Sequence, residues 1–75
     1  MKKRIIKKSG IVKSFDKSKG CGWIVPNDGM SDLYVHQRSI KDDDISTLSI
    51  GAMVTFESRF VKDVGLEAFN VSLSK

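Results

Sequence analysis

The sequence predicts an all-β fold, a small barrel of five strands that is closed or nearly closed. Three observations lead to this fold class. The stretches able to form regular structure are short and rich in Val, Ile and Phe, a composition typical of strands. Clusters of Gly, Asn, Asp and Ser, which favour turns, separate these stretches. Five of them share one chain of 75 residues, and such a sheet closes because closure removes exposed strand edges.

Turn-forming segments set the expected limits of the strands. The segments DKSKG, PNDGMSD and KDVG are interpreted as turns, and Pro26 should end the second strand because it has no N–H to donate. The segment IKDDDISTLSIG is a longer connection, with a single helical turn expected near residues 38–40. We expect strands at residues 7–16, 21–25, 33–37, 52 to 60 or 61, and 66–73.

Composition excludes several classes of protein. One cysteine cannot form an intramolecular disulfide, and one cysteine with one histidine cannot complete a Cys/His zinc site. No apolar run approaches the roughly 20 residues that span a bilayer, and the segment MKKRIIKK lacks the apolar region of a secretory signal. We therefore expect a cytoplasmic protein with no metal, no cofactor and no membrane association.

Positive charge is concentrated at the start of the chain. The net charge is +4, but residues 9–75 hold eight basic and nine acidic side chains, a net charge of −1. We expect residues 1–8 to form a flexible basic arm that attracts polyanions, and residues 9–75 to form the folded domain. A terminus that is merely solvated is the alternative. The domain itself lacks the basic balance of a strong electrostatic nucleic-acid binder.

Alternation along the second and third expected strands separates a core side from a solvent side, because successive side chains point to opposite faces. The expected core positions are Ile24, Leu33 and Val35. The outward positions, here named the aromatic face, are Trp23, Tyr34 and His36. If the two strands pair through the PNDGMSD turn, these rings lie side by side. An exposed aromatic cluster needs an explanation, because scattered apolar residues do not gather in this way by default.

Aromatic side chains on a basic surface are suited to single-stranded nucleic acid. Each base stacks on an aromatic ring with a gain of about 1–3 kcal/mol. Lys13 and Lys19 flank this pair of strands and are candidates for phosphate contacts. Gly20 and Gly22 have no side chain, so we expect them to let bases and backbone approach closely and the strand bend sharply.

The segment GIVKSFDKSKGCGWIVPNDGMSDLYVHQRSI resembles the cold-shock domain, a five-stranded antiparallel OB-fold barrel. The family motif K-G-F-G-F-I is matched by K-G-C-G-W-I, and V-F-V-H-F by L-Y-V-H-Q. The family patterns L-x-x-G-x-x-V-x-F and A-x-N-V follow later in the chain. The resemblance covers residues 9–73. It implies binding of single-stranded RNA and DNA with little sequence specificity, and an RNA-chaperone role in melting RNA secondary structure.

The sequence also departs from the family at four stacking positions, which hold Ser14, Cys21, Gln37 and Ile45. The remaining stacking candidates are Trp23, Tyr34 and His36, with Phe15 as a fourth contact at the edge. Because each platform contributes free energy, we expect weaker binding than the family pattern implies. The proline of the family's G-P-x-A segment is absent as well, which leaves the shape of that loop open.

Two polar candidates complete the expected site. Asp32 stands where the family has an acidic residue near the aromatics, and it is a candidate for hydrogen bonding to a base edge. Arg38 follows Gln37 and could replace lost stacking with its guanidinium plane, or contact a phosphate. His36 could instead serve as a structural hydrogen-bonding group.

The sequence therefore predicts a non-enzymatic protein whose partner is single-stranded RNA or DNA, with no small-molecule substrate. No set of nucleophile, base and acid is visible, and Cys21 in a strand lacks the surroundings that activate a thiol. The alternative is a barrel that has exchanged base stacking for a protein–protein surface and acts as an interaction or regulatory module. Monomer and homodimer both remain open.

Overall fold

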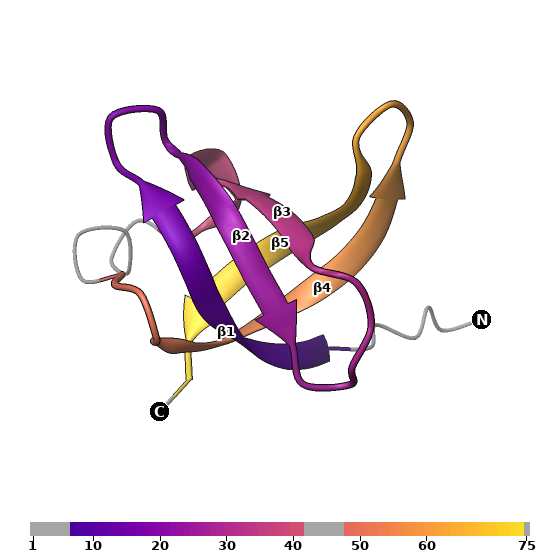
Figure 1. The fold of residues 1–75 in the computed structure, drawn as a ribbon, viewed down its shortest axis with the longest axis horizontal. Helices are drawn as coiled ribbons and strands as arrows, with labels where there is room; N and C mark the ends of the chain where they lie inside the picture. Colours follow the sequence, from indigo (N-terminus) through magenta and orange to yellow (C-terminus); the bar gives the residue numbers. More distant parts are fainter. Residues whose placement is uncertain (1–6, 42–47, 75) are drawn as a thin grey trace.

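The computed structural model describes residues 7–41 and 48–74 of the chain. They form five strands and one short 3-10 turn (Figure 1). The elements are β1 (Lys7–Asp16), β2 (Cys21–Pro26), β3 (Leu33–His36), η1 (Gln37–Ser39), β4 (Met53–Val61) and β5 (Gly65–Leu73). All five expected strands are confirmed to within one residue at each end. The helical turn begins one residue earlier than expected, at Gln37, which shortens the third strand.

The strands close into a barrel in the order β1-β2-β3-β5-β4, and β4 returns to β1. The all-β OB-fold barrel expected from the sequence is confirmed. Four of its strand pairs are antiparallel, but β3 and β5 run parallel, with Tyr34 opposite Glu67. No hairpin connects these two strands, so no turn signal in the sequence sets their relative direction.

A β-bulge at Lys13 lets β1 serve two partners. Val12 lies opposite Ile24 and Ser14 lies opposite Trp23, so Lys13 is the extra residue. A bulge bends its strand and increases the local twist. The first half of β1 accordingly pairs with β4, and its full length from Gly10 onward pairs with β2.

Gly22 is required by the close approach of β1. A Cβ atom there would collide with the carbonyl oxygen of Ser14 and lie 2.7 Å from Cα of Phe15. Gly22 is buried and its missing side chain points toward β1. The expected close approach of backbone at this glycine is therefore present, and the expected close approach of bases stays a prediction. Gly20 instead takes a positive φ of 72° in the β1–β2 turn, a conformation that glycine adopts without steric cost.

The barrel interior confirms the expected alternation. Ile24, Leu33 and Val35 are buried, and Trp23 is exposed on the opposite side. Phe56 of β4 is the largest fully buried hydrophobic side chain in residues 7–41 and 48–74. Among the described residues, the buried hydrophobic side chains are Val12, Ile24, Leu33, Val35, Ile40, Leu48, Val54, Phe56, Ala68 and Val71.

The basic arm is described only in part. Lys7 and Lys8 begin β1, and Lys8 Nζ forms an ion pair with Asp28 at 2.9 Å. Residues 1–6 lie outside the described residues, so the arm stays a prediction. Within residues 7–41 and 48–74, no helix has the length and apolar character needed to cross a bilayer. The same residues contain no cluster of three or more His, Cys, Asp or Glu side chains suited to a metal ion.

Candidate nucleic-acid interface

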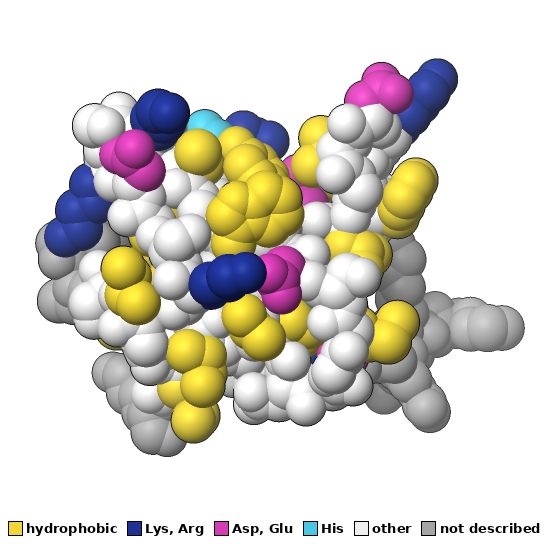
Figure 2. Space-filling model, in the orientation of Figure 1, with side chains coloured by type: hydrophobic (Ala, Val, Ile, Leu, Met, Phe, Trp, Pro, Cys, Tyr) yellow, Lys and Arg dark blue, Asp and Glu magenta, His cyan; other side chains and the backbone are white. Residues whose placement is uncertain are grey.

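Trp23 and Tyr34 form the centre of the aromatic face. They are directly opposite each other on β2 and β3, with ring centroids 5.7 Å apart and ring planes at 75°. This edge-to-face packing holds both rings in place. Trp23 is 45% exposed to solvent. Figure 2 shows hydrophobic side chains gathered over β2 and β3. The predicted pair is thus present, with Trp23 exposed and Tyr34 half-buried beside it.

His36 continues the aromatic face one step along β3, opposite Cys21 on β2. Its Nδ1 accepts a hydrogen bond of 3.1 Å from the backbone N–H of Arg38. Because Nδ1 is the acceptor, Nε2 carries the proton in the neutral ring and is the ring's donor. The hydrogen bond caps η1, so the structural alternative for His36 is present. It fixes the ring in the outward position that stacking requires.

Cys21 and Tyr34 interact between the neighbouring strands β2 and β3. The pKa of the Tyr34 hydroxyl is raised because that group hydrogen-bonds to the Cys21 side chain, with partial burial as a second cause. Tyr34 is therefore neutral at physiological pH and presents no charge to a phosphate backbone. Cys21, half-buried and free of any disulfide, helps to hold that ring.

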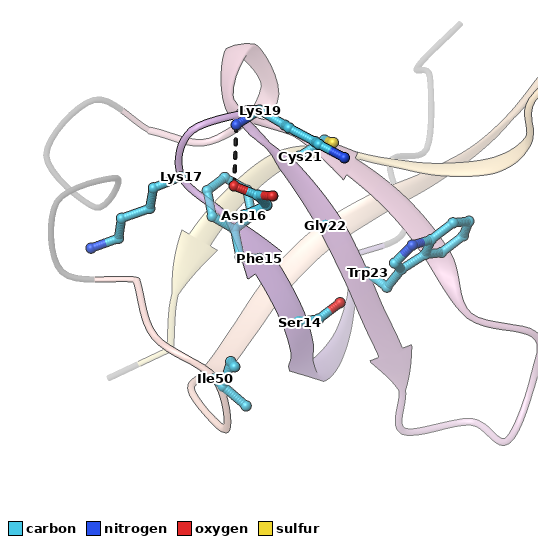
Figure 3. Close-up of a pocket in the computed structure, with 9 residues that line it drawn as sticks. All are labelled: Ser14, Phe15, Asp16, Lys17, Lys19, Cys21, Gly22, Trp23 and Ile50. Carbon is cyan, nitrogen blue, oxygen red and sulfur yellow. Dashed lines mark hydrogen bonds between the residues drawn. The ribbon is translucent and has the colours of Figure 1, made fainter.

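An open groove of about 550 Å³ lies beside the aromatic face, along β1 and β2 (Figure 3). Its lining residues are Ser14, Phe15, Asp16, Lys17, Lys19, Cys21, Gly22, Trp23 and Ile50. Two of them, Ser14 and Cys21, occupy positions where the resemblance places aromatic rings. Their small side chains leave space that larger residues would fill. Figure 3 shows Ile50 and Trp23 on opposite sides of the groove.

Phe15 and Lys19 both belong to this groove. Phe15 is half-buried and packs against the core, so it is available at the edge of the site rather than as a free platform. Lys19 belongs to the β1–β2 turn, where its backbone N–H donates to the Asp16 carboxylate at 3.3 Å. Hydrogen bonds from Ser18 and from the Lys19 backbone lower the pKa of Asp16. This turn places the Lys19 cation next to the groove.

Lys13 and Asp32, predicted as separate contacts, bind each other. Lys13 Nζ lies 3.0 Å from Asp32 Oδ2. The Lys13 side chain is on the bulge and mostly exposed, and an exposed ion pair contributes only about 0–1 kcal/mol. A phosphate can therefore replace Asp32 as the partner of Lys13 at small cost. That exchange would free the Asp32 carboxylate for a base edge.

Glu67 is a residue beside the candidate site that the sequence did not lead us to expect there. It lies opposite Tyr34, is only 2% exposed, and its Oε2 has no hydrogen-bond partner among the described residues. The Arg38 guanidinium, 3.6 Å away, provides the neighbouring positive charge. A buried polar atom without a hydrogen bond is costly, so such atoms often mark functional sites. A charged residue within the strand sequence GLEAFN was the available signal.

Of the substituted stacking positions, Gln37 is among the described residues and Ile45 is not. Gln37 begins η1, its backbone N–H donates to the Gly20 carbonyl at 2.7 Å, and its side chain lies next to Gly20. It therefore lies over the β1–β2 turn. Ile45 falls outside the described residues, so its role as a substituted stacking position stays a prediction.

A small closed barrel with ordered rings on its outer surface is the arrangement of OB-fold nucleic-acid-binding proteins. Comparison with known families agrees with this class of protein and identifies one family within it. The family described as "'Cold-shock' DNA-binding domain" matches residues 8–74. The chain belongs to this cold-shock domain family, whose members bind nucleic acids.

Individual relatives are similar over most of the chain. Cold shock-like protein CspG of Shewanella violacea is 43% identical over 63 residues, which are 84% of this chain and 89% of that protein. Cold shock-like protein CspB of Escherichia coli is 46% identical over 50 residues, 67% of this chain and 71% of that protein.

Among solved structures, drosophila Unr CSD456 superimposes with a TM-score of 0.76 at 17% identity. The match covers 95% of this chain and 28% of that chain. At this low identity the likeness concerns the fold.

Proposed function

We propose that this protein binds single-stranded RNA or DNA on the outer surface of β1, β2 and β3, with little sequence specificity. The pair of exposed Trp23 and half-buried Tyr34, packed edge to face at 5.7 Å, is the observation that carries the proposal. Trp23, Tyr34 and His36 stack on successive bases, and Phe15 contacts a base at the edge of the groove. Stacking tolerates sequence because every base presents a π-face.

The polar residues hold the backbone of the strand. Lys19 and Lys13 contact phosphates, with Lys13 leaving Asp32 when it does so, and Asp32 then accepts a hydrogen bond from a base edge. Arg38 stays near Glu67 and offers its exposed guanidinium to a phosphate or a base. Residues 1–8 add long-range attraction through their positive charge.

The proposed binding is modest in strength and passive in mechanism. Stacking positions held by Ser14, Cys21 and Gln37 contribute little, so affinity is lower than a full set of rings would give. Because the protein prefers unpaired strands, it shifts RNA hairpins toward their open forms by mass action. This chaperone role involves no catalytic step and no cofactor, and we place it in the cytoplasm. One copy of the chain carries the whole site.

One observation favours the alternative of a protein–protein surface. Ile11 lies opposite both Val25 and Met53, and all three side chains are 40–52% exposed. This row crosses β2, β1 and β4 beside the aromatic face. A partner protein that covered both areas would make the barrel an interaction module, with nucleic-acid binding weak or lost.

Fluorescence titration of Trp23, the single tryptophan, tests the proposal. We expect quenching by a pyrimidine-rich single strand, weaker quenching by the matched duplex, and loss of affinity as salt rises. Replacing Lys2, Lys3 and Arg4 by Gln should make the salt dependence shallower, because fewer counterions are released. An unchanged Trp23 signal at high micromolar oligonucleotide contradicts the proposal. Co-purification of a stable protein partner would then favour the alternative.

A further inference from the structure

An arginine and an aromatic ring are stacked on the side of the barrel formed by β4 and β5. The guanidinium carbon of Arg59 lies 4.7 Å from the centre of the Phe69 ring. Phe69 is half-buried, whereas the Arg59 side chain is 56% exposed. The ring therefore covers one side of the guanidinium group, and solvent reaches the other.

Two further side chains hold this arginine in place. Arg59 Nη2 donates to Glu57 Oε1 at 3.1 Å, and Asn70 Nδ2 donates to Glu57 Oε2 at 2.8 Å. These two bonds, with that from Asn70 the stronger cause, lower the pKa of Glu57. Asn70 has a positive φ of 53°, a conformation that asparagine tolerates better than most residues. Arg59 is thus positioned by a network, unlike a freely rotating surface side chain.

Strand register places Arg59 in line with the aromatic face. Trp23 lies opposite Tyr34, Tyr34 opposite Glu67, and Glu67 opposite Arg59. These four residues form one row around the barrel, across β2, β3, β5 and β4. Neighbouring strands are about 4.8 Å apart, so Arg59 is roughly 10 Å from Tyr34 along the row. Glu67 between them is buried and has Arg38 beside it, so it presents no exposed anion.

We propose that Arg59, backed by Phe69, is a further stacking platform that takes one nucleobase from a single strand crossing β5 beyond Tyr34. This proposal rests on the function proposed above and extends its site onto β4 and β5. A guanidinium plane stacks on flat rings, and base stacking on such groups is tolerant of sequence. The arrangement would then be ring, arginine and base in three layers.

The alternative role for Arg59 is simple attraction of a phosphate. Its charge is already paired with Glu57 at 3.1 Å, which reduces its pull on a second anion. The proposed role depends on the planar shape of the group, whereas attraction depends on charge alone. Lysine keeps the charge and removes the plane, so Arg59→Lys separates the two roles.

The test compares short and long oligothymidylates, of about four and about eight nucleotides, by Trp23 fluorescence. For the unchanged protein we expect the longer strand to bind more tightly. Arg59→Lys and Phe69→Leu should each weaken binding of the longer strand by about fivefold or more and leave the shorter strand unaffected. Lys62→Gln, which removes an exposed charge from the same hairpin, is the control and should preserve the gain with length.

The outcomes are distinct. If the Arg59→Lys variant binds the longer strand as tightly as the unchanged protein does, Arg59 is not a stacking platform. The proposed function is unaffected by that result. The same holds if Lys62→Gln loses as much affinity as Arg59→Lys, since charge then accounts for the effect. If neither strand alters Trp23 fluorescence in the unchanged protein, the proposed function fails, and the platform fails with it. Thermal unfolding of each variant checks that the barrel is intact.

Discussion

The outer surface of the barrel has two aromatic regions that differ in what each ring contacts. On β2 and β3, the rings of Trp23 and Tyr34 contact each other, and Trp23 is exposed to solvent while Tyr34 is half-buried. On β4 and β5, Phe69 lies beneath Arg59, and Glu57 and Asn70 fix that arginine. The first region is an uncovered hydrophobic surface, whereas the second has its ring covered by a charged group of the same chain.

This difference shows how a small barrel can display rings without losing its core. The exposed rings of the aromatic face lie on strands whose opposite sides are fully buried, so alternation separates the two roles. The β4–β5 region depends on a hydrogen-bonded network instead. Substitutions that shift β1 or β2 should therefore disturb the aromatic face. Substitutions that remove a charge should disturb the β4–β5 region.

The largest effect is expected from a change beneath the aromatic face, Gly22→Ala. The added Cβ would collide with the backbone of β1 at Ser14, and backbone cannot move aside as a flexible side chain can. We expect a loss of about 3 kcal/mol or more in the free energy of unfolding, measured by denaturant titration. Gly51→Ala, where φ is 90° but the space is open, is the control and should cost about 1–2 kcal/mol. Equal losses in the two variants would contradict this account of Gly22.

The next effect concerns the exposed ring itself. Trp23→Ala removes a stacking platform at the centre of the aromatic face and should weaken binding by about 2 kcal/mol, roughly thirtyfold. Trp23→Phe keeps a ring and should retain most of the affinity. Because both variants lack the tryptophan signal, anisotropy of a labelled oligonucleotide is the measurement. Similar affinities for the alanine and phenylalanine variants would show that stacking at this position is unimportant.

A gain of affinity is expected from restoring a ring at Cys21. The side chain there lines an open groove, so a larger group can be added without burial in the core. Cys21→Phe should tighten binding by about fivefold or more. Cys21→Ala removes the thiol that hydrogen-bonds to Tyr34 but adds no ring, and serves as the control. A phenylalanine variant that binds no more tightly than the alanine variant would argue against a stacking surface at this position.

The smallest expected effect is a pH-dependent stabilisation by Glu57 in the β4–β5 region. Asn70 and Arg59 lower the pKa of Glu57 in the folded protein. A lowered carboxyl pKa adds stability above the pKa of the unfolded chain, near pH 4.3, and this stability is lost as pH falls through the folded value. The melting temperature of the unchanged protein should exceed that of Glu57→Gln at neutral pH, and the gap should close below about pH 4. A gap that stays constant into acid would assign the effect to packing.

Much of the fold could be predicted because the deciding signals are local. Turn segments bounded the strands, and alternation in β2 and β3 assigned Ile24 to the core and Trp23 to the surface. The parallel contact of β3 with β5 could not be predicted in this way, because it joins segments far apart in sequence. Glu67 was missed for the same reason, since its burial depends on Tyr34 and Arg38.

The site was predictable only where single strands determine it. The positions of Trp23, Tyr34 and His36 follow from a period of two along their strands. The ion pair of Lys13 with Asp32 depends on a bulge that no local pattern announces. The Arg59–Phe69 pair depends on the pairing of two strands, because β4 and β5 place Glu57 opposite Phe69 and Arg59 opposite Glu67.

The location of binding is the central claim, and amide chemical-shift mapping tests it most directly. The chain is labelled with nitrogen-15 and titrated with an oligothymidylate of about eight nucleotides. We expect the largest shifts at Trp23, Tyr34 and His36, including the Trp23 indole N–H, with further shifts at Arg59 and Phe69. Shifts confined to the Ile11, Val25 and Met53 row, or spread only over exposed lysines, would contradict the claim that the aromatic face binds the strand.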